Sequence, residues 1–156
     1  MSKPRVFFIA LFVILTAMPP VSANELDGFR GMYWGESLRA FKYMKFVAQL
    51  DGIKYYRKLN DELFVGGAGL TDINYAFFKD RLVGVVMLAN GKENARLMLE
   101  ALKYSFGTPS VLDEGVYSWD FVKIKILYRY DPYSKNLRVS YLSGETLVKM
   151  RRDKHL

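Results

Sequence analysis

Few residues of this 156-residue chain are of types that commonly carry catalysis. Its only histidine, His155, stands in the penultimate position, and cysteine is absent. A Ser-His-Asp or Cys-His device needs a positioned imidazole, which the frayed end of a chain does not supply. A zinc site built from cysteine and histidine is excluded by the same count. We therefore predict no catalytic residue, no metal ligand and no bound cofactor.

Two acidic pairs and one glycine cluster are the other candidate sites. Asp61-Glu62 and Asp113-Glu114 could act as acid and base in glycoside cleavage. Because both pairs stand beside turns, we interpret them as solvated surface acids. The glycine-rich residues 66–69 lack the Lys-Ser/Thr pair and the following helix of a phosphate-binding loop, so they indicate a turn.

The last strands carry the one pattern that indicates a binding surface. Residues 122–130 alternate between apolar and polar side chains, and residues 137–142 answer them after a loop that begins at Asp131-Pro132. This pattern predicts an antiparallel hairpin. We take the register of this hairpin from the pairing of Tyr130 with Leu137.

In that register Arg129 faces Arg138, and Lys125 and Lys123 continue a basic stripe along the same face. Directly opposed like charges destabilise a sheet, so this face would gain from an acidic partner. We name these four residues as a candidate patch for an anionic partner. The alternative is a solvated sheet face that only keeps the protein in solution.

The first residues have the three parts of a signal peptide. Lys3 and Arg5 precede an uncharged apolar run at 6–18, and small residues lead to Ala23, the predicted cleavage site. A spanning helix needs about 20 residues, so an uncleaved membrane anchor is the lesser alternative. The absence of cysteine excludes a lipoprotein anchor and disulfides. We expect residues 1–23 to direct export to the periplasm or the medium.

The remaining chain has the size of one domain. We expect a globular domain over 24–148, a basic tail over 149–156 and no transmembrane segment after cleavage. Without the signal peptide the chain has 21 basic and 16 acidic residues, a net charge of +5. This bias permits contact with an anionic lipid or polymer without requiring it. The export signal and the modest charge disfavour nucleic acid as a partner.

The periodicity predicts an α+β fold with a mostly antiparallel sheet of six to seven strands. A short helix is expected over 36–43, capped by Ser37, and a longer amphipathic helix over 91–106, with Asn90 and Glu93 forming a capping box. Helices are too few for alternating βαβ units. The longer expected strands are 45–50, 53–58, 71–78, 82–89, 115–120, 122–130 and 137–142.

A set of spaced residues across 28–142 resembles a family of small exported bacterial proteins whose function is not established. The residues that carry it include Phe29-Arg30-Gly31, Trp34-Gly35, Ser37, Gly66-Gly67, Tyr75-Ala76-Phe77, Leu99, Phe106-Gly107-Thr108-Pro109 and Tyr117-Ser118-Trp119. The resemblance implies an exported single domain. It implies no activity, ligand or catalytic residue.

Two functional hypotheses follow. The first is a non-enzymatic interaction or accessory module of the cell envelope, with an envelope protein or an anionic envelope polymer as its partner. The second is a hydrolase of an envelope polymer that works with carboxylate, tyrosine and lysine side chains. A pocket of converging acids would favour the enzyme. The sequence does not indicate an oligomeric state.

Overall fold

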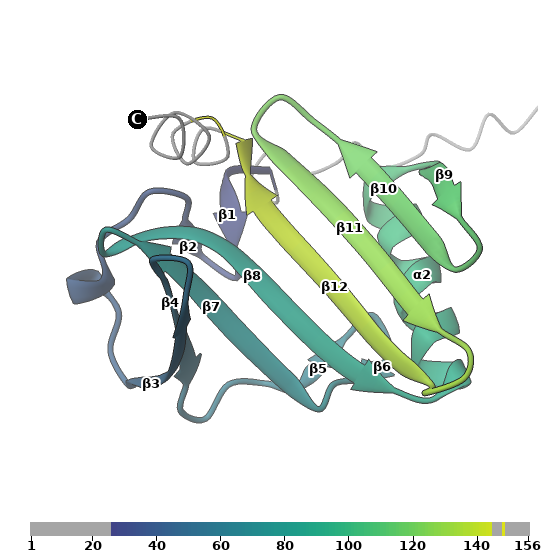
Figure 1. Cartoon of the computed structure of the whole chain (residues 1–156), viewed down its shortest axis with the longest axis horizontal. Helices are drawn as coiled ribbons and strands as arrows, with labels where there is room; N and C mark the ends of the chain where they lie inside the picture. The colour runs from purple at the N-terminus through teal and green to yellow at the C-terminus, as the bar shows by residue number, and fades with distance from the viewer. Residues whose placement is uncertain (1–25, 145–147, 149–156) are drawn as a thin grey trace, which may run out of the picture.

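The computed structural model describes residues 26–144 and 148. The predicted signal peptide with its cleavage site at Ala23 and the basic tail 149–156 lie outside these residues. Within them the chain forms an antiparallel sheet of eight strands (Figure 1). In spatial order these are β3 (Met44–Leu50), β4 (Ile53–Lys58), β7 (Asp72–Phe78), β8 (Arg81–Asn90), β12 (Asn136–Ser143), β11 (Ile124–Asp131), β10 (Val116–Asp120) and β9 (Ser110–Asp113).

Short elements and one long helix complete the described chain. Two hairpins pair β1 (Gly28–Phe29) with β2 (Met32–Tyr33) and β5 (Phe64–Val65) with β6 (Ala68–Gly69). The helical elements are η1 (Leu38–Ala40), a single 3₁₀ turn, and α2 (Lys92–Phe106). No helix in the described part of the chain is long and apolar enough to cross a membrane.

The predicted α+β fold with two helices is wrong, because the structure is mostly β, with 53% strand and 18% helix. The helix expected over 36–43 shrinks to η1. Ser37 does cap this turn, and its Oγ accepts a hydrogen bond from the Arg39 N–H at 3.4 Å. The sheet has eight strands, whereas six to seven were predicted. The additional strand is β9, which the sequence does not reveal because it is short, exposed throughout and without alternation.

The backbone hydrogen bonds explain why no longer helix forms after Ser37. The Leu38 N–H donates to the Asp80 carbonyl at 2.9 Å, and the Leu82 N–H donates to the Glu36 carbonyl at 2.9 Å. The segment therefore bonds to the β7–β8 hairpin, and these bonds replace further helical turns beyond the single turn of η1. Tyr43, with φ of 63°, then turns the chain into β3.

The second half of the sheet repeats the topology of the first. Strands β3, β4, β7 and β8 run from one edge to the centre, and β9, β10, β11 and β12 run from the other edge to the centre. The two four-stranded halves join where β8 pairs with β12 (Figure 1). A helical element precedes each half, η1 in the first and α2 in the second. This is the arrangement of a duplicated helix–four-strand unit.

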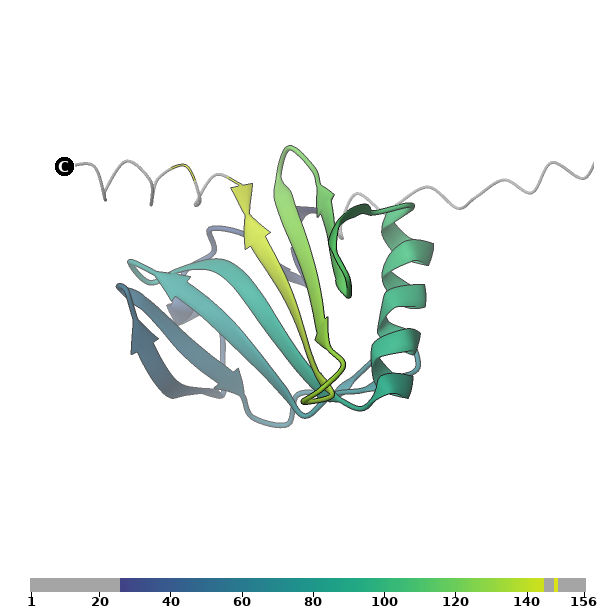
Figure 2. The ribbon, with the colours of Figure 1, turned by 45° about the vertical axis from the view of Figure 1, so that its right-hand side comes forward.

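The core lies between α2 and one face of the sheet (Figure 2). The apolar stripe predicted for α2 faces this core, since Ala95, Met98, Leu102 and Phe106 are buried and Leu99, its fifth predicted member, is partly buried. The Tyr128 hydroxyl ties the sheet to the helix by donating to the Ala95 carbonyl at 3.0 Å.

The two ends of α2 differ in how well the sequence predicts them. The predicted capping box is wrong, because the N-cap is Gly91 and no side chain caps it. Asn90 instead donates to the Asn136 side chain at 3.0 Å, across the β8–β12 pair, and Glu93 pairs with Arg96. The predicted end at Gly107 is confirmed, and its N–H donates to the Lys103 carbonyl.

Candidate functional site

One face of the sheet is bare. Helix α2 and the hairpins β1–β2 and β5–β6 contribute to the core on one side, and no element of residues 26–144 crosses the other side (Figure 2). We call this other side the open face. It carries the side chains that alternate with the buried ones, such as Leu127 and Arg129 between the core residues of β11.

Two arginines stand directly opposite each other on the open face. Tyr130 pairs with Leu137, as the register above requires, and Arg129 is therefore the cross-strand neighbour of Arg138. Both side chains are exposed. Neither forms an ion pair with a residue that the structure describes, and the Arg138 Nε makes one long hydrogen bond, 3.5 Å, to the Ser140 Oγ.

The two lysines of the predicted stripe are engaged elsewhere. Lys123 lies in the loop before β11 and pairs with Asp27. Lys125 is on the open face, but its Nζ lies 2.8 Å from the Asp120 carboxylate. That hydrogen bond lowers the pKa of Asp120 below its usual range. The structure thus brings Arg129 and Arg138 together and neutralises the charge of Lys123 and Lys125.

A hollow of about 250 Å³ lies beside the arginine pair, and we call it the central hollow. Its floor is made of small residues of the central strands, including Ala76 and Gly84. Its other lining residues include Tyr55, Leu127, Leu142 and Arg138. The open face therefore combines an apolar depression with two adjacent positive charges.

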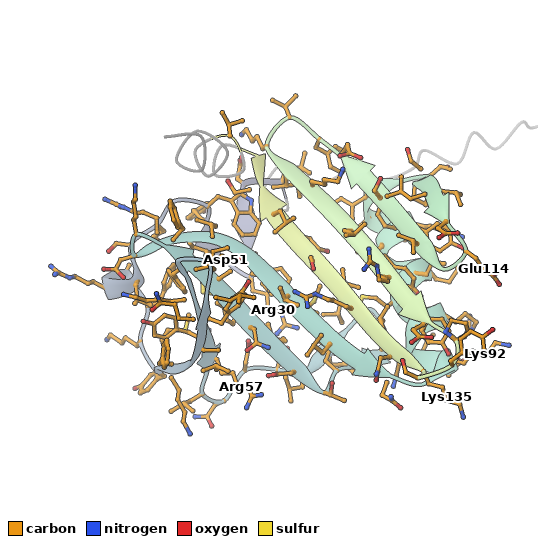
Figure 3. The ribbon with its side chains drawn as sticks, in the orientation of Figure 1. Arg30, Asp51, Arg57, Lys92, Glu114 and Lys135 are labelled. Atoms are coloured by element: carbon orange, nitrogen blue, oxygen red, sulfur yellow. The ribbon has the colours of Figure 1, made fainter. Side chains whose placement is uncertain are left out.

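An acid and an amide occupy the same face farther along β7. Asp72 accepts from Arg57 at 2.5 Å and from the Asn74 amide at 2.9 Å. Burial raises the pKa of Asp72, but these hydrogen bonds outweigh it, and the net pKa lies below the usual range. The Asn74 Oδ1 is buried without a hydrogen-bond partner among the described residues. Arg57 stands at the margin of the sheet in Figure 3.

A second cluster lies on the covered side and was missed from the sequence. The Asp61 carboxylate accepts from the Arg30 guanidinium at 3.0 Å and from the Tyr75 hydroxyl at 2.5 Å. Arg30 also donates to the carbonyls of Glu62 and Phe64 at 2.6 and 2.7 Å. The Asp61 side chain is only 10% exposed, so its interpretation as a solvated acid is wrong. The separation of 31 residues between Arg30 and Asp61 left no local signal.

The buried hydroxyl group of Tyr75 should make the stability of the protein fall at alkaline pH. Burial, and then the Asp61 hydrogen bond, raise the pKa of Tyr75 far above that of an exposed tyrosine, about 10. Folded Tyr75 stays neutral while the unfolded residue ionises, so its contribution is complete below pH 10 and is lost above it. We expect Tyr75→Phe to reduce the fall in unfolding free energy above pH 10 by about 1.4 kcal/mol per pH unit. Urea unfolding at pH 9 to 11 measures this slope, and an unchanged slope would contradict it.

Asp61 and Asp72 do not form an arrangement suited to hydrolysis. Asp61 and Asp72 line one surface depression of about 280 Å³, but each is held by an arginine. The pKa of Asp72 is lowered, whereas a general acid needs a raised one. Among the described residues no group of three or more His, Cys, Asp or Glu could hold a metal ion.

Comparison with known proteins does not assign a function. No family model, curated protein or solved structure matches the chain. The resemblance of residues 28–142 to small exported bacterial proteins stays a prediction. The site must therefore be interpreted from its own geometry, in which the open face is the main feature.

Proposed function

We propose that the protein is a non-enzymatic binding module of the bacterial cell envelope that docks an acidic partner protein on its open face. The observation that carries the proposal is the opposed pair Arg129 and Arg138, without an acid among the described residues to neutralise it. Opposed like charges cost a sheet about 0.2–1 kcal/mol, and a carboxylate placed between them removes that cost. Arginine also binds carboxylates through two parallel hydrogen bonds.

The central hollow supports a protein as the partner. Protein interfaces combine an apolar centre with polar surroundings, and arginine is enriched at both interfaces and their energetic hot spots. The hollow has apolar walls from Tyr55, Leu127 and Leu142 and lies against Arg138. A large side chain next to a carboxylate would fill the hollow and meet the arginines together. An anionic envelope polymer would use the charges and leave the hollow empty.

The proposed location rests on the predicted signal peptide, residues 1–23. The hydrolase alternative has weaker support. Its carboxylates Asp61 and Asp72 are partners of Arg30 and Arg57, and this pairing accounts for them without catalysis.

Charge reversal tests the proposal. We expect the double variant Arg129→Glu with Arg138→Glu to keep its unfolding free energy within about 0.5 kcal/mol, because both side chains are exposed and one like-charged pair replaces another. Binding should fall at least about tenfold, because the partner's acids now meet acids. Lys92→Glu with Lys103→Glu is the matched control. It makes the same change of charge on α2, on the covered side, and should bind normally.

A site-specific crosslink identifies the partner. A photo-crosslinking phenylalanine at position 127 lies on the open face, and the same group at Tyr104 lies on the exposed side of α2. We expect one dominant adduct from position 127 in growing cells and its loss in the arginine double variant. The affinity of that purified partner is then measured for each variant. Equal capture from both positions, or a partner indifferent to the reversal, would reject the open face as the docking surface.

A further inference from the structure

Large apolar side chains gather in solvent at the β3 edge of the sheet (Figure 1). Tyr43, Phe46 and Leu50 are each more than half exposed, and Leu59 is 50% exposed. The Leu59 N–H donates to the Tyr43 carbonyl at 2.8 Å, which places these two residues side by side next to β3. Exposed apolar side chains are ordinary when scattered singly, but a group of them marks an interaction surface.

Three lysines surround these side chains. Lys42 precedes Tyr43, Lys45 precedes Phe46, and Lys58 is the cross-strand neighbour of Met44. None of the three lysines has an ion-pair partner in residues 26–144. Other lysines are paired with acids, namely Lys54, Lys103, Lys123 and Lys125. We call the following residues the lysine patch: Lys42, Tyr43, Lys45, Phe46, Lys58 and Leu59.

The opposite edge of the sheet has apolar side chains with the other sign of charge. Val111 and Leu112 of β9 are 70% and 57% exposed, and Asp113 and Glu114 follow them directly. Positive charge beside exposed apolar side chains is therefore a property of the β3 edge and not of both edges.

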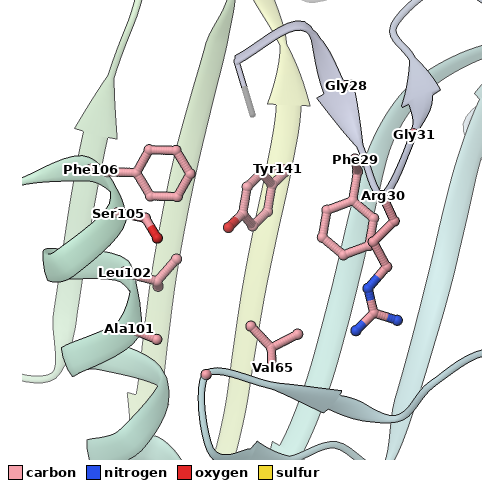
Figure 4. A pocket seen from close by; sticks show the side chains of 11 residues that line it. Gly28, Phe29, Arg30, Gly31, Val65, Ala101, Leu102, Ser105, Phe106 and Tyr141 are labelled. Atoms are coloured by element: carbon pink, nitrogen blue, oxygen red, sulfur yellow. The ribbon is translucent and has the colours of Figure 1, made fainter. Parts of the chain in front are cut away.

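The largest cavity of the covered side has no such free charge. It has a volume of about 460 Å³ and lies between the second half of α2 and the β1–β2 hairpin (Figure 4). Its charged lining residue is Arg30, which pairs with Asp61 and donates to the carbonyls of Glu62 and Phe64. The charges of the lysine patch are not taken up in this way, so they favour an anionic partner.

A polypeptide fits the lysine patch poorly. Strand addition to β3 is opposed by the irregular pairing between Phe46 and Ala48 and by the charge of Lys45, and both are features that protect sheet edges. Lysine is depleted in protein interfaces, whereas the arginines of the open face belong to a type that is enriched there. A second copy of the chain would bring its own lysines against these lysines, and like charges repel.

The surface of an anionic membrane matches both components of the patch. Tyrosine rings are enriched at the level of the lipid head groups. Lysine stems lie along apolar surface while their ammonium groups reach the phosphates. Each lysine near an anionic bilayer strengthens binding by about fivefold. Apolar contact and a basic cluster together give the two signals that stable peripheral attachment requires.

We propose that the protein attaches peripherally to an anionic phospholipid surface through the lysine patch. The β3 edge faces the bilayer, with Tyr43 and Phe46 at the level of the head groups and the lysines at the phosphates. Arg129 and Arg138 lie on β11 and β12, in the other half of the sheet, so a partner docked there does not compete with the membrane. The attachment does not depend on the docking proposed above, and either can fail alone.

Sedimentation with vesicles tests the proposal. The protein is purified after expression of the full chain, so that processing by the cell has taken place. We expect it to bind vesicles of phosphatidylcholine with about one quarter phosphatidylglycerol at least about tenfold more strongly than vesicles of phosphatidylcholine alone, and more weakly as salt is raised. Absence of binding overturns the proposal, and equal binding to the two kinds of vesicle overturns the role of the lysines.

Neutralising the lysines tests the location. The triple variant Lys42→Gln, Lys45→Gln and Lys58→Gln should bind the anionic vesicles at least about tenfold more weakly than the parent. The matched control removes the same charge elsewhere, by the substitutions Lys92→Gln, Lys103→Gln and Lys135→Gln. Lys92 and Lys135 lie far from Arg57, the cross-strand neighbour of Lys45 (Figure 3). The control should bind within about threefold of the parent, and an equal loss in both variants rejects the lysine patch.

A tryptophan at the patch reports contact with lipid without removing a charge. Tyr43→Trp should show a blue shift of its emission when anionic vesicles are added, and lipids brominated near the head group should quench it. Tyr133→Trp is the matched control, because Tyr133 is 96% exposed in the turn between β11 and β12 and should show neither effect. Trp34 and Trp119 are present in both variants, so they do not contribute to the difference. Bound protein without a shift at position 43 rejects the lysine patch as the attachment surface.

Discussion

Replacing Asp61 with alanine is expected to lower the free energy of unfolding by about 3 kcal/mol. The change removes the carboxylate that pairs with Arg30 and accepts from the Tyr75 hydroxyl. Tyr75 is fully buried, so its hydroxyl would be left without a partner in the core. Loss of one partner from a buried pair commonly costs about 3–5 kcal/mol, and the lower value applies because the Arg30 side chain keeps 25% exposure.

Two matched variants separate the parts of this loss. Tyr75→Phe removes only the hydroxyl and should cost about 1 kcal/mol. Asp113→Ala changes the same residue type at the exposed end of β9, where the carboxylate accepts from the Glu114 N–H, and should cost less than about 0.5 kcal/mol. Urea unfolding followed by circular dichroism measures all three. A loss for Asp61→Ala no greater than for Asp113→Ala would show that the buried pair does not stabilise the fold.

The cluster matters because it joins segments distant in the chain. Arg30 belongs to the β1–β2 turn, Asp61 to the connection before β5, and Tyr75 to the centre of β7. Asp61→Ala should therefore loosen one wall of the cavity as well as the sheet. Faster hydrogen exchange at residues 28–33 than at β11 would be the local sign of this loosening.

The strand pairs that follow short turns could be predicted from the sequence because their signals are local. Asp51-Gly52 marks the β3–β4 turn, and positive φ at both residues gives the expected hairpin. The alternation from Ile124 to Tyr130 predicted which side chains of β11 face the core, and the pairing of Tyr130 with Leu137 followed. The start of the expected strand was wrong, because Val122 is exposed and lies in the loop before β11. The pair Arg129–Arg138 was within reach of sequence reasoning for that reason.

What could not be predicted depends on partners far apart in the chain. The segment after Ser37 has the residues of a helix start, but its backbone bonds to Asp80 and Leu82 decide its conformation. Lys123 and Lys125 fit a basic stripe until Asp27 and Asp120 are placed beside them. The sequence shows only the spacing of residues along the chain, whereas these contacts form between segments that the folded sheet brings together.

The repeated four-strand arrangement could not be predicted from the sequence either. The two halves share a topology, but their residues match too poorly for a repeat to be predicted from the sequence. The helical elements diverge most, with α2 at 15 residues and η1 at three. In the first half the β1–β2 and β5–β6 hairpins contribute the apolar contacts over β7 and β8, for example from Phe29 to Tyr75. The cavity lies along the boundary between these hairpins and α2.

The joint between the halves depends on Gly84, and we expect Gly84→Ala to lower the free energy of unfolding by about 3 kcal/mol. A Cβ at this position would lie 2.6 Å from the Tyr141 carbonyl oxygen. That atom belongs to the backbone of the neighbouring central strand, so β8 and β12 must separate for the methyl group to enter. Gly84 pairs with Ala76 on one side and Leu142 on the other, so the strain falls in the middle of the sheet.

Gly69→Ala is the matched control, because the nearest atom to its new Cβ is the Asn94 Oδ1 at 3.7 Å, an ordinary contact. It should change stability by less than about 0.5 kcal/mol. Thermal unfolding should place the midpoint of Gly84→Ala roughly 10 °C below that of Gly69→Ala. Equal midpoints would mean that β8 and β12 part without cost and that the close approach is not needed.

The same substitution connects the packing of the sheet to the proposed docking surface. Gly84 forms part of the floor of the central hollow, so the added methyl group would both fill the hollow and push β12, which carries Arg138, away from β8. Gly84→Ala should therefore weaken binding of the partner even at temperatures where it stays folded. Gly69 lies on the covered side and is not among the residues that line the hollow, so its variant should bind as the parent does. If folded Gly84→Ala protein binds the partner with unchanged affinity, the partner docks elsewhere. The reason is that the central hollow and the position of Arg138 both depend on the close approach of β8 and β12 at Gly84.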